Sequence, residues 1–458
     1  MRKLTNLRNI VDSNLEKLDM SQEAKSKLKS EVKKRDFRKL SFVSIPFAAA
    51  ILVFIIISTG LFSGDRTLKV FAENLMKEIK PQKVQTVELK NEFIDSTADF
   101  SVDLFKQSYT KGKNSLVSPT SLYLALGMTA NGAEGNTLKE FETLLGKPNI
   151  NLMSLNSYYN TLSKRLTSVN SGKLSIANSI WYSQDKSLTV KRDFLQTNAD
   201  YYNAAVYKAD FKDTKTVKDI NNWVKFNTGN KIDKIIDKIE DNSVMYLINA
   251  IYFQDQWKEV YKKEDIRKDN FILTNGTKQS VDFMYSQENS YLKDDRSEGF
   301  IKPYKNGKYS FVALLPNENI SIDNYISSLS GESFIKLLKN KSEEKVSAAL
   351  PKFKAEDKIN LVEPLKKMGL KECFDPSKAN FTKMGSSQGE NVFVGKVMQK
   401  TFINVDEQGT KAAAVTEIEM RATGMPISHS ITLNRPFVYA IIDNETNLPV
   451  FIGTMMKP

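Results

Sequence analysis

An uncharged, mostly apolar run from Leu40 to Phe62 divides the chain into two unequal parts. A helix of this length crosses a hydrocarbon core of about 30 Å. The alternatives are a cleaved secretion signal and a buried core helix. However, the charged arm before the run is longer than secretion signals use, and no Ala-x-Ala cleavage site follows it. We therefore predict an uncleaved transmembrane signal anchor at residues 40–62.

The charges that flank this run predict its orientation. Residues 1–39 hold 12 Lys or Arg against 6 Asp or Glu. Their excess of positive charge is half of the net charge of +12 of the whole chain. Cations crowd this side, so the positive-inside rule predicts that residues 1–39 form a cytoplasmic arm and that the C-terminal part lies outside the cell. Residues 63–90 are polar and are predicted to form a stalk. The charge comes without any nucleic-acid-binding motif, so we expect no nucleic-acid partner.

The chain has one cysteine and one histidine, which restricts its chemistry. Cys373 alone can form neither an intramolecular disulfide nor a multi-cysteine metal site. A hydrolase that uses Ser118 or Ser121 would need His429 as its base. His429 lies between two prolines in a loop-like stretch, so we expect it on the solvated surface. We expect no enzyme activity, no metal and no cofactor, and keep the hydrolase as a minor alternative.

From about residue 91 the sequence has the mixed apolar and polar pattern of a globular domain. The overall composition, 41% hydrophobic and 26% charged, is sufficient for a core without disulfides. Helical patterns come first, at Ala98–Lys106 and Ser118–Asn131. Strand patterns follow, at Tyr309–Pro316, Lys345–Lys354 and Pro436–Ile442. This order predicts an α+β domain over residues 91–458.

Residues 404–426 fit two kinds of secondary structure. From Thr410, every second residue is small or apolar and the residues between them are mostly charged, which is the period of a strand. The same residues include good helix formers, and Glu417 with Arg421 at i,i+4 would support a surface helix. Both interpretations remain open from the pattern alone.

Several segments, taken in order, resemble the serpin family and together cover residues 93–458. Each motif is weak alone, but the ordered set is specific. The segments are Asn114–Ser121 (NSLVSPTS), Ala130–Thr137 (ANGAEGNT), Ile220–Val224 (INNWV), Thr228–Ile232 (TGNKI), Asn249–Phe253 (NAIYF) before Trp257, Leu350–Phe353 (LPKF), Asn434–Val438 (NRPFV) and Phe451–Gly453 (FIG).

This resemblance implies a fold and a function. The serpin fold has several helices packed around a large central mixed β-sheet, with smaller sheets and an exposed reactive loop, here at about 407–426. Its inhibitory members trap a serine protease irreversibly by inserting the cleaved loop into the central sheet, which is an example that general accounts of strand addition use. We expect a monomer whose partner is an elastase-, subtilisin- or trypsin-like serine protease. The alternative is a non-inhibitory serpin that acts as a surface binding or structural module.

The resemblance also assigns roles within the reactive loop. The hinge, which starts insertion, has mostly small side chains that can enter a sheet without a clash. The family's usual spacing from the hinge gives Thr423–Gly424 as the scissile bond, with Arg421 and Met425 as alternative residues before the cut. The implied hinge residues are Glu407, Gly409, Thr410, Ala412, Ala413, Ala414 and Thr416.

A second set of residues is implied for the region where the central sheet opens. Gln399 stands where many family members carry a histidine, and its amide can still hydrogen-bond the nearby serines. We therefore expect sheet opening to survive but to lose any pH sensitivity that a histidine would give. The implied residues are Ser118, Ser121, Asn249, Trp257 and Gln399.

Overall fold

The computed structural model describes residues 68, 70–147, 150–168, 172–184, 188–240, 243–386, 391–410 and 429–458. The predicted anchor at 40–62 and the cytoplasmic arm lie outside these residues. Among the described residues, none of the helices is both long enough and apolar enough to cross a membrane. The compact unit begins at Leu68.

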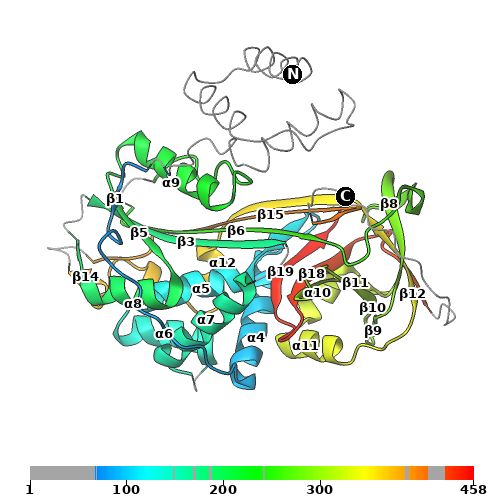
Figure 1. The fold of residues 1–458 in the computed structure, drawn as a ribbon, viewed down its shortest axis with the longest axis horizontal. Coiled ribbons are helices and arrows are strands. Elements are labelled where there is room, and N and C mark those ends of the chain that lie inside the picture. The colour runs from blue at the N-terminus through cyan, green and yellow to red at the C-terminus, as the bar shows by residue number, and fades with distance from the viewer. Residues whose placement is uncertain are drawn as a thin grey trace, which may run out of the picture. The chain divides into compact units, whose positions relative to one another are not determined.

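A large mixed sheet organises this unit (Figure 1). Its longest central strand, β6, is nearly continuous in apolar residues because both of its faces are covered. β6 runs antiparallel to β3 and parallel to β15. Within the described residues the strand order is β1 (Glu73–Asn74), β5 (Ala205–Ala209), β3 (Lys173–Ser183), β6 (Met245–Gln256), β16 (Gly409–Thr410), β15 (Lys396–Asp406) and β13 (Phe353–Asn360).

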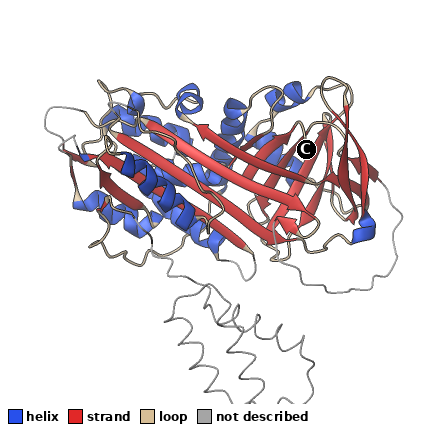
Figure 2. Ribbon diagram, turned by 90° about the horizontal axis from the view of Figure 1, so that it is seen from above, coloured by secondary structure: helices blue, strands red, loops and turns tan. Residues whose placement is uncertain are grey.

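Helices cover both faces of this sheet. On the inner face α5 is buried along its whole length and packs against β3 and β6. On the outer face α9 (Thr214–Asn227) buries Ile220 and Trp223 against alternate residues of β6, and Figure 2 looks onto the long strands from that side. The helices on the inner side are α4 (Asn91–Ser108), α5 (Pro119–Ala130), α6 (Gly135–Gly146), α7 (Leu152–Thr167) and α8 (Arg192–Tyr202).

Three smaller sheets, three short α-helices and two 3-10 helices, at Lys263–Asp265 and Glu372–Phe374, complete the described part of the chain. One sheet has the order β2 (Ser115–Val117), β19 (Pro449–Met455), β18 (Phe437–Asp443), β11 (Tyr309–Pro316), β10 (Ser297–Pro303) and β9 (Tyr291–Lys293). The next has β17 (His429–Thr432), β12 (Val346–Pro351), β8 (Lys278–Glu288) and β7 (Ile266–Ile272). β14 (Gly385–Ser386) pairs with β4 (Thr189–Val190), and the helices are α10 (Ile322–Ser328), α11 (Gly331–Lys339) and α12 (Val362–Lys367).

The predicted elements agree with this architecture except where one element divides. The strand predicted at Tyr309–Pro316 is β11, and the helix predicted at Ser118–Asn131 is α5, with Pro119 at its first position. The single strand predicted over 345–354 is instead two strands. The chain leaves β12 after Pro351 and enters a different sheet as β13, and local periodicity carries no information about such a change of sheet.

The predicted stalk also differs from the structure, because residues 70–90 lie along the domain. The amides of Phe71 and Ala72 each donate to Asp219 Oδ2 at 2.8 Å. Further along, the amide of Val87 donates to the Thr161 hydroxyl at 2.9 Å. Leu75 and other apolar side chains of this segment pack against the core. Burying them outweighs the polar character that suggested a free linker.

Candidate functional site

The first hinge residues form a very short strand inside the central sheet. β16 pairs antiparallel with β15 through Val405↔Thr410 and with β6 through Asp255↔Thr410. Gly409 has φ +143°, and a Cβ there would lie 2.2 Å from the carbonyl oxygen of Asp255, so only glycine fits between the strands. The Thr410 side chain is fully buried. The chain has therefore entered the sheet by two residues.

Beyond β16 the same two strands pair directly with each other. β15 and β6 are in parallel register from Lys396↔Tyr246 to Phe402↔Tyr252. Over this length no other strand lies between them. The sheet is thus open at its hinge end and closed along the rest of the β6–β15 contact, and further insertion requires these two strands to separate.

A buried polar cluster lies under the closed part of the sheet. Gln399 Nε2 donates to Asn249 Oδ1 at 2.7 Å, which joins β15 to β6 across the line of separation. The amide of Ser118 donates to Gln399 Oε1 at 2.9 Å, and Asn249 Nδ2 donates to the Ser121 hydroxyl at 2.5 Å. Asn249 Nδ2 also donates to Asn178 Oδ1. We call Ser118, Ser121, Asn178, Asn249 and Gln399 the polar cluster.

Four of the five residues expected at the sheet opening belong to the polar cluster, and the fifth lies at the hinge end of the same sheet. Trp257 is at the hinge end, where its backbone amide donates to Gln408 O at 3.0 Å and its indole Nε1 to Asp406 O at 2.8 Å. Its ring stacks on Tyr304 with the centroids 4.5 Å apart. The Tyr304 hydroxyl shares a 2.7 Å hydrogen bond with the Thr410 hydroxyl. Trp257 and Tyr304 therefore position the hinge.

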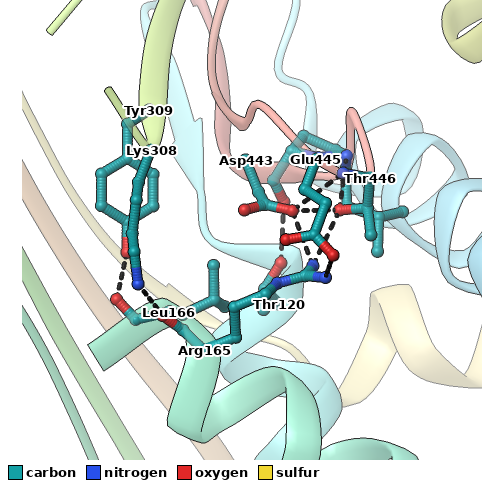
Figure 3. Close-up of polar contacts among 10 residues, drawn as sticks. Thr120, Arg165, Leu166, Lys308, Tyr309, Asp443, Glu445 and Thr446 are labelled. Carbon is teal, nitrogen blue, oxygen red and sulfur yellow. Dashed lines mark hydrogen bonds and ion pairs between the residues drawn. The ribbon is translucent and has the colours of Figure 1, made fainter. Parts of the chain in front are cut away.

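Tyr304 itself is held by a turn that is anchored on α7. In this β10–β11 turn, Lys308 Nζ donates to Arg165 O at 2.9 Å, and the Tyr309 hydroxyl donates to Leu166 O (Figure 3). Arg165 in turn pairs with Asp443 at 2.7 Å. Both carbonyls belong to the last turn of α7, where helices leave acceptors unpaired. The hinge contact is thus fixed to the end of a helix.

Two ion pairs flank the hinge. Lys352 pairs with Glu407 at 2.7 Å, and this hydrogen bond holds the pKa of Glu407 below its usual value. The other pair, Lys302 with Glu288 at 2.7 Å, is almost fully buried beside Trp257 and Tyr261. Burial alone would lower the pKa of Lys302, but Tyr261 and Glu288 outweigh burial and raise it. Neither pair has a signal in the local sequence, since each joins residues distant in the chain.

We had expected His429 on the solvated surface, but it is half-buried and held by contacts. It begins β17, pairs with Val346 of β12, and stacks on Tyr291 with a centroid distance of 3.7 Å. Its Nε2 lies 2.9 Å from Glu344 Oε2. Ser118, in contrast, lies under the central sheet, where its hydroxyl donates to Val450 O rather than capping α5. The serine–histidine arrangement considered for a hydrolase is therefore not formed.

The remaining predicted loop residues lie outside the described part of the chain. These are the hinge residues Ala412, Ala413, Ala414 and Thr416, and the residues Arg421, Thr423, Gly424 and Met425 at the alternative scissile bonds.

Comparison with known proteins identifies the family. The family model described as Serpin (serine protease inhibitor) matches residues 95–458. The chain belongs to the serpin family. Human Serpin B13 is 28% identical over 382 residues, which cover 78% of this chain and 97% of that relative. The resemblance inferred from the ordered motifs is thereby confirmed.

Two solved structures of one serpin are also similar to this chain. The thermophilic serpin Tengpin in its native state is 48% identical, covers 85% of this chain and 100% of its own, and has a TM-score of 0.81. Tengpin in its latent state is 46% identical, covers 81% of this chain and 99% of its own, and has a TM-score of 0.72. The TM-score is thus higher for the native structure than for the latent one.

Proposed function

We propose that this serpin is an irreversible, suicide-substrate inhibitor of a serine protease. The observation that carries the proposal is β16, a hinge that has entered the sheet in a defined register while β6 and β15 remain paired beyond it. An inhibitor of this type needs a strand that is ready to insert and a sheet that has not yet opened.

The register of β16 predicts where the rest of the loop would go. Continued antiparallel pairing places Ala412 between Phe253 and Ile403, and Thr416 between Asn249 and Gln399. Residues 410, 412, 414 and 416 would then face the inner core, where small side chains avoid a clash. The charged alternate residues would face outward. Thr416 would arrive at the hydrogen bond that joins β6 to β15, so its hydroxyl would replace that bond as the strands part.

The chemistry begins as ordinary proteolysis. The serine of the protease attacks the carbonyl of the residue before the scissile bond, an ester forms, and the new amine leaves. The freed loop then inserts and carries the esterified protease with it. Residues 410–423 in extended form span about 46 Å at about 3.3 Å per residue. Such a displacement would distort the protease before water hydrolyses the ester.

The scissile bond is proposed to be Thr423–Gly424, with Arg421 and Met425 as alternatives. A small or β-branched residue before the cut favours elastase- or subtilisin-like proteases, whereas Arg421 favours trypsin-like ones. The intact masses of the two fragments after brief proteolysis locate the bond. Release of the fragment that begins at Ala422 would transfer the assignment to Arg421.

Incubation with a panel of trypsin-, elastase- and subtilisin-like proteases tests inhibition directly. We expect at least one protease to form a complex with the serpin that survives boiling in detergent. Thr410→Arg should abolish this complex and leave only cleaved serpin, because an arginine cannot fill the buried site beside Tyr304. Thr410→Ser is the matched control and should retain trapping. Cleavage of the wild type by every protease, with no complex, would favour the non-inhibitory binding module.

We also propose that residues 40–62 anchor the serpin in a membrane, with residues 1–39 cytoplasmic and the serpin domain outside. The length and lack of charge of the run and the cations before it support this. Extraction of membranes at alkaline pH should leave the full chain in the pellet, whereas a chain that lacks residues 1–62 should be released. Added protease should digest the serpin domain on intact cells. Release of the full chain at alkaline pH would contradict the anchor.

A further inference from the structure

Asp255 is a buried carboxylate at the mouth of the central sheet. It lies on β6 directly opposite Thr410, and its residue is 1% exposed. Oδ1 accepts the amide of Gln256 at 2.8 Å, whereas Oδ2 has no hydrogen-bond partner among the described residues. The α7–β3 connection makes room for the group with a glycine, since a Cβ on Gly172 would lie 2.7 Å from Asp255 Cγ. An ionised carboxylate with an unpaired oxygen is costly in such a place.

The groups that face Asp255 come from each neighbouring element. The β10–β11 turn contributes Lys305, the amide of Asn306, and the phenols Tyr304 and Tyr309. β16 contributes Thr410, which carries no charge. Burial raises the pKa of Asp255 to about 6, and the amides of Gln256 and Asn306 and the charge of Lys305 offset this only in part.

Asp406, on β15, also lies near Tyr304, and burial raises its pKa as well. Its carboxylate accepts the amide of Gln408 at 3.0 Å and the side-chain amide of Asn404 at 2.7 Å. Hydrogen bonds from the amides of Gln408 and Gly409 oppose this rise, so the turn that leads into β16 holds the charged form of Asp406, whereas ionised Asp255 has no such bond from the hinge among the described residues.

The position of the hinge decides whether water reaches Asp255. Direct pairing of β6 with β15 ends at Tyr252 and Phe402, and from there β16 fills the space between the strands. Withdrawal of Gly409 and Thr410 would open this end of the sheet beside Asp255 and let water solvate its carboxylate. Protonation of Asp255 and insertion of Gly409–Thr410 are thus linked.

We propose that Asp255 is a proton-sensitive positioning residue for the hinge: its neutral acid favours keeping Gly409–Thr410 between β6 and β15, and its carboxylate favours their withdrawal. The inference deepens the proposed function, because it predicts that the reactive loop is less held by the sheet at neutral pH than in acid. It rests on that function only for this consequence, since the hinge movement itself requires no protease.

The direction of the pH dependence follows from the linkage between protonation of Asp255 and the two positions of the hinge, inserted and withdrawn. With the hinge inserted the pKa of Asp255 is about 6, and with water present it should return toward its ordinary 3.8. A group whose pKa is higher in one state stabilises that state at low pH. The preference for insertion should therefore fall as pH rises from about 4 to about 6 and be constant above. A difference of about two pKa units limits the change to about 100-fold.

Hydrogen exchange of the full chain tests the proposal without a protease. The readout is the protection of the amides in the peptide that contains Gly409 and Thr410, measured by mass spectrometry from pH 4.5 to 7.5. Each rate is divided by the intrinsic exchange rate at that pH. The wild type should lose protection as pH rises, by up to about 30-fold over this range. Asp255→Asn should keep the acid level of protection at every pH, and Asp406→Asn should retain the wild-type fall.

Three results would overturn the proposal. These are a wild-type profile without pH dependence, an Asp255→Asn profile that still falls, and an Asp406→Asn profile that no longer does. If Asp255→Asn does not fold, the wild-type and Asp406→Asn profiles still decide the matter. Inhibition could fail in every protease assay and leave this measurement unaffected, so the two proposals can fail separately.

Discussion

At the scale of single residues, the buried pair of Lys302 and Glu288 makes the strongest stability prediction. Glu288→Gln would leave the Lys302 ammonium buried at 2% side-chain exposure without its counter-ion. Breaking a buried ion pair in this way costs about 3–5 kcal/mol. We expect the midpoint of chemical denaturation to fall accordingly, and the hinge to loosen because Lys302 packs near Trp257.

The matched control removes both charges. In Lys302→Met with Glu288→Leu no buried charge is left unpaired, so most of the lost stability should return. If the double variant were as unstable as Glu288→Gln, side-chain packing rather than the unpaired charge would explain the loss.

Among the secondary-structure elements, β6 and β15 are joined by the polar cluster, and we expect it to raise the barrier to their separation. Gln399→Leu removes the bond to Asn249 and leaves the buried amide of Ser118 without its acceptor, each at a cost of about 1–3 kcal/mol. The closed sheet is weakened, so the intact chain should convert faster on warming to a form with its uncleaved loop inserted. The measurement is the fraction that resists unfolding in urea as a function of time.

Gln399→His is the comparison for this element. Only a neutral imidazole can both accept and donate as Gln399 does, because the protonated ring has no acceptor. The conversion rate of this variant should therefore depend on pH between about 5 and 8. The wild-type cluster holds amides and hydroxyls but no titrating group. A Gln399→Leu variant that converts no faster than the wild type would show that the cluster does not control opening.

At the scale of the whole molecule, the proposed function makes stability a matter of rate. The native sheet would be trapped short of its best-bonded arrangement, because a further strand can be added between β6 and β15. Cleavage of the loop by a protease that is not trapped should let that strand insert. Each of its backbone hydrogen bonds adds about 1 kcal/mol, so the gain should be on the order of 10 kcal/mol and the unfolding temperature should rise by tens of degrees.

Calorimetry of intact and cleaved protein measures this change. Thr410→Arg, cleaved in the same way, is the control and should gain little, since its hinge cannot enter the sheet. A cleaved wild type that melts at the same temperature as the intact protein would contradict loop insertion.

Patterns in the sequence were sufficient to predict the α+β class, the positions of elements such as α5 and β11, and the family. They also indicated a segment near Thr410 that is compatible with a strand and has one small face. These features are local. Side-chain period reports which face of an element is buried, and the ordered motifs report the fold that those elements share with relatives.

What each buried face contacts is known from the tertiary structure alone. The structure divided 345–354 between two sheets, laid residues 70–90 along the domain, and placed Trp257 at the hinge end of the sheet, apart from the polar cluster. It also gave Asp255 a role, because the cost of a buried carboxylate depends on a turn and a strand far away in the chain. Charge, burial and hydrogen bonding belong to contacts between distant segments, and no local pattern specifies which segments will meet.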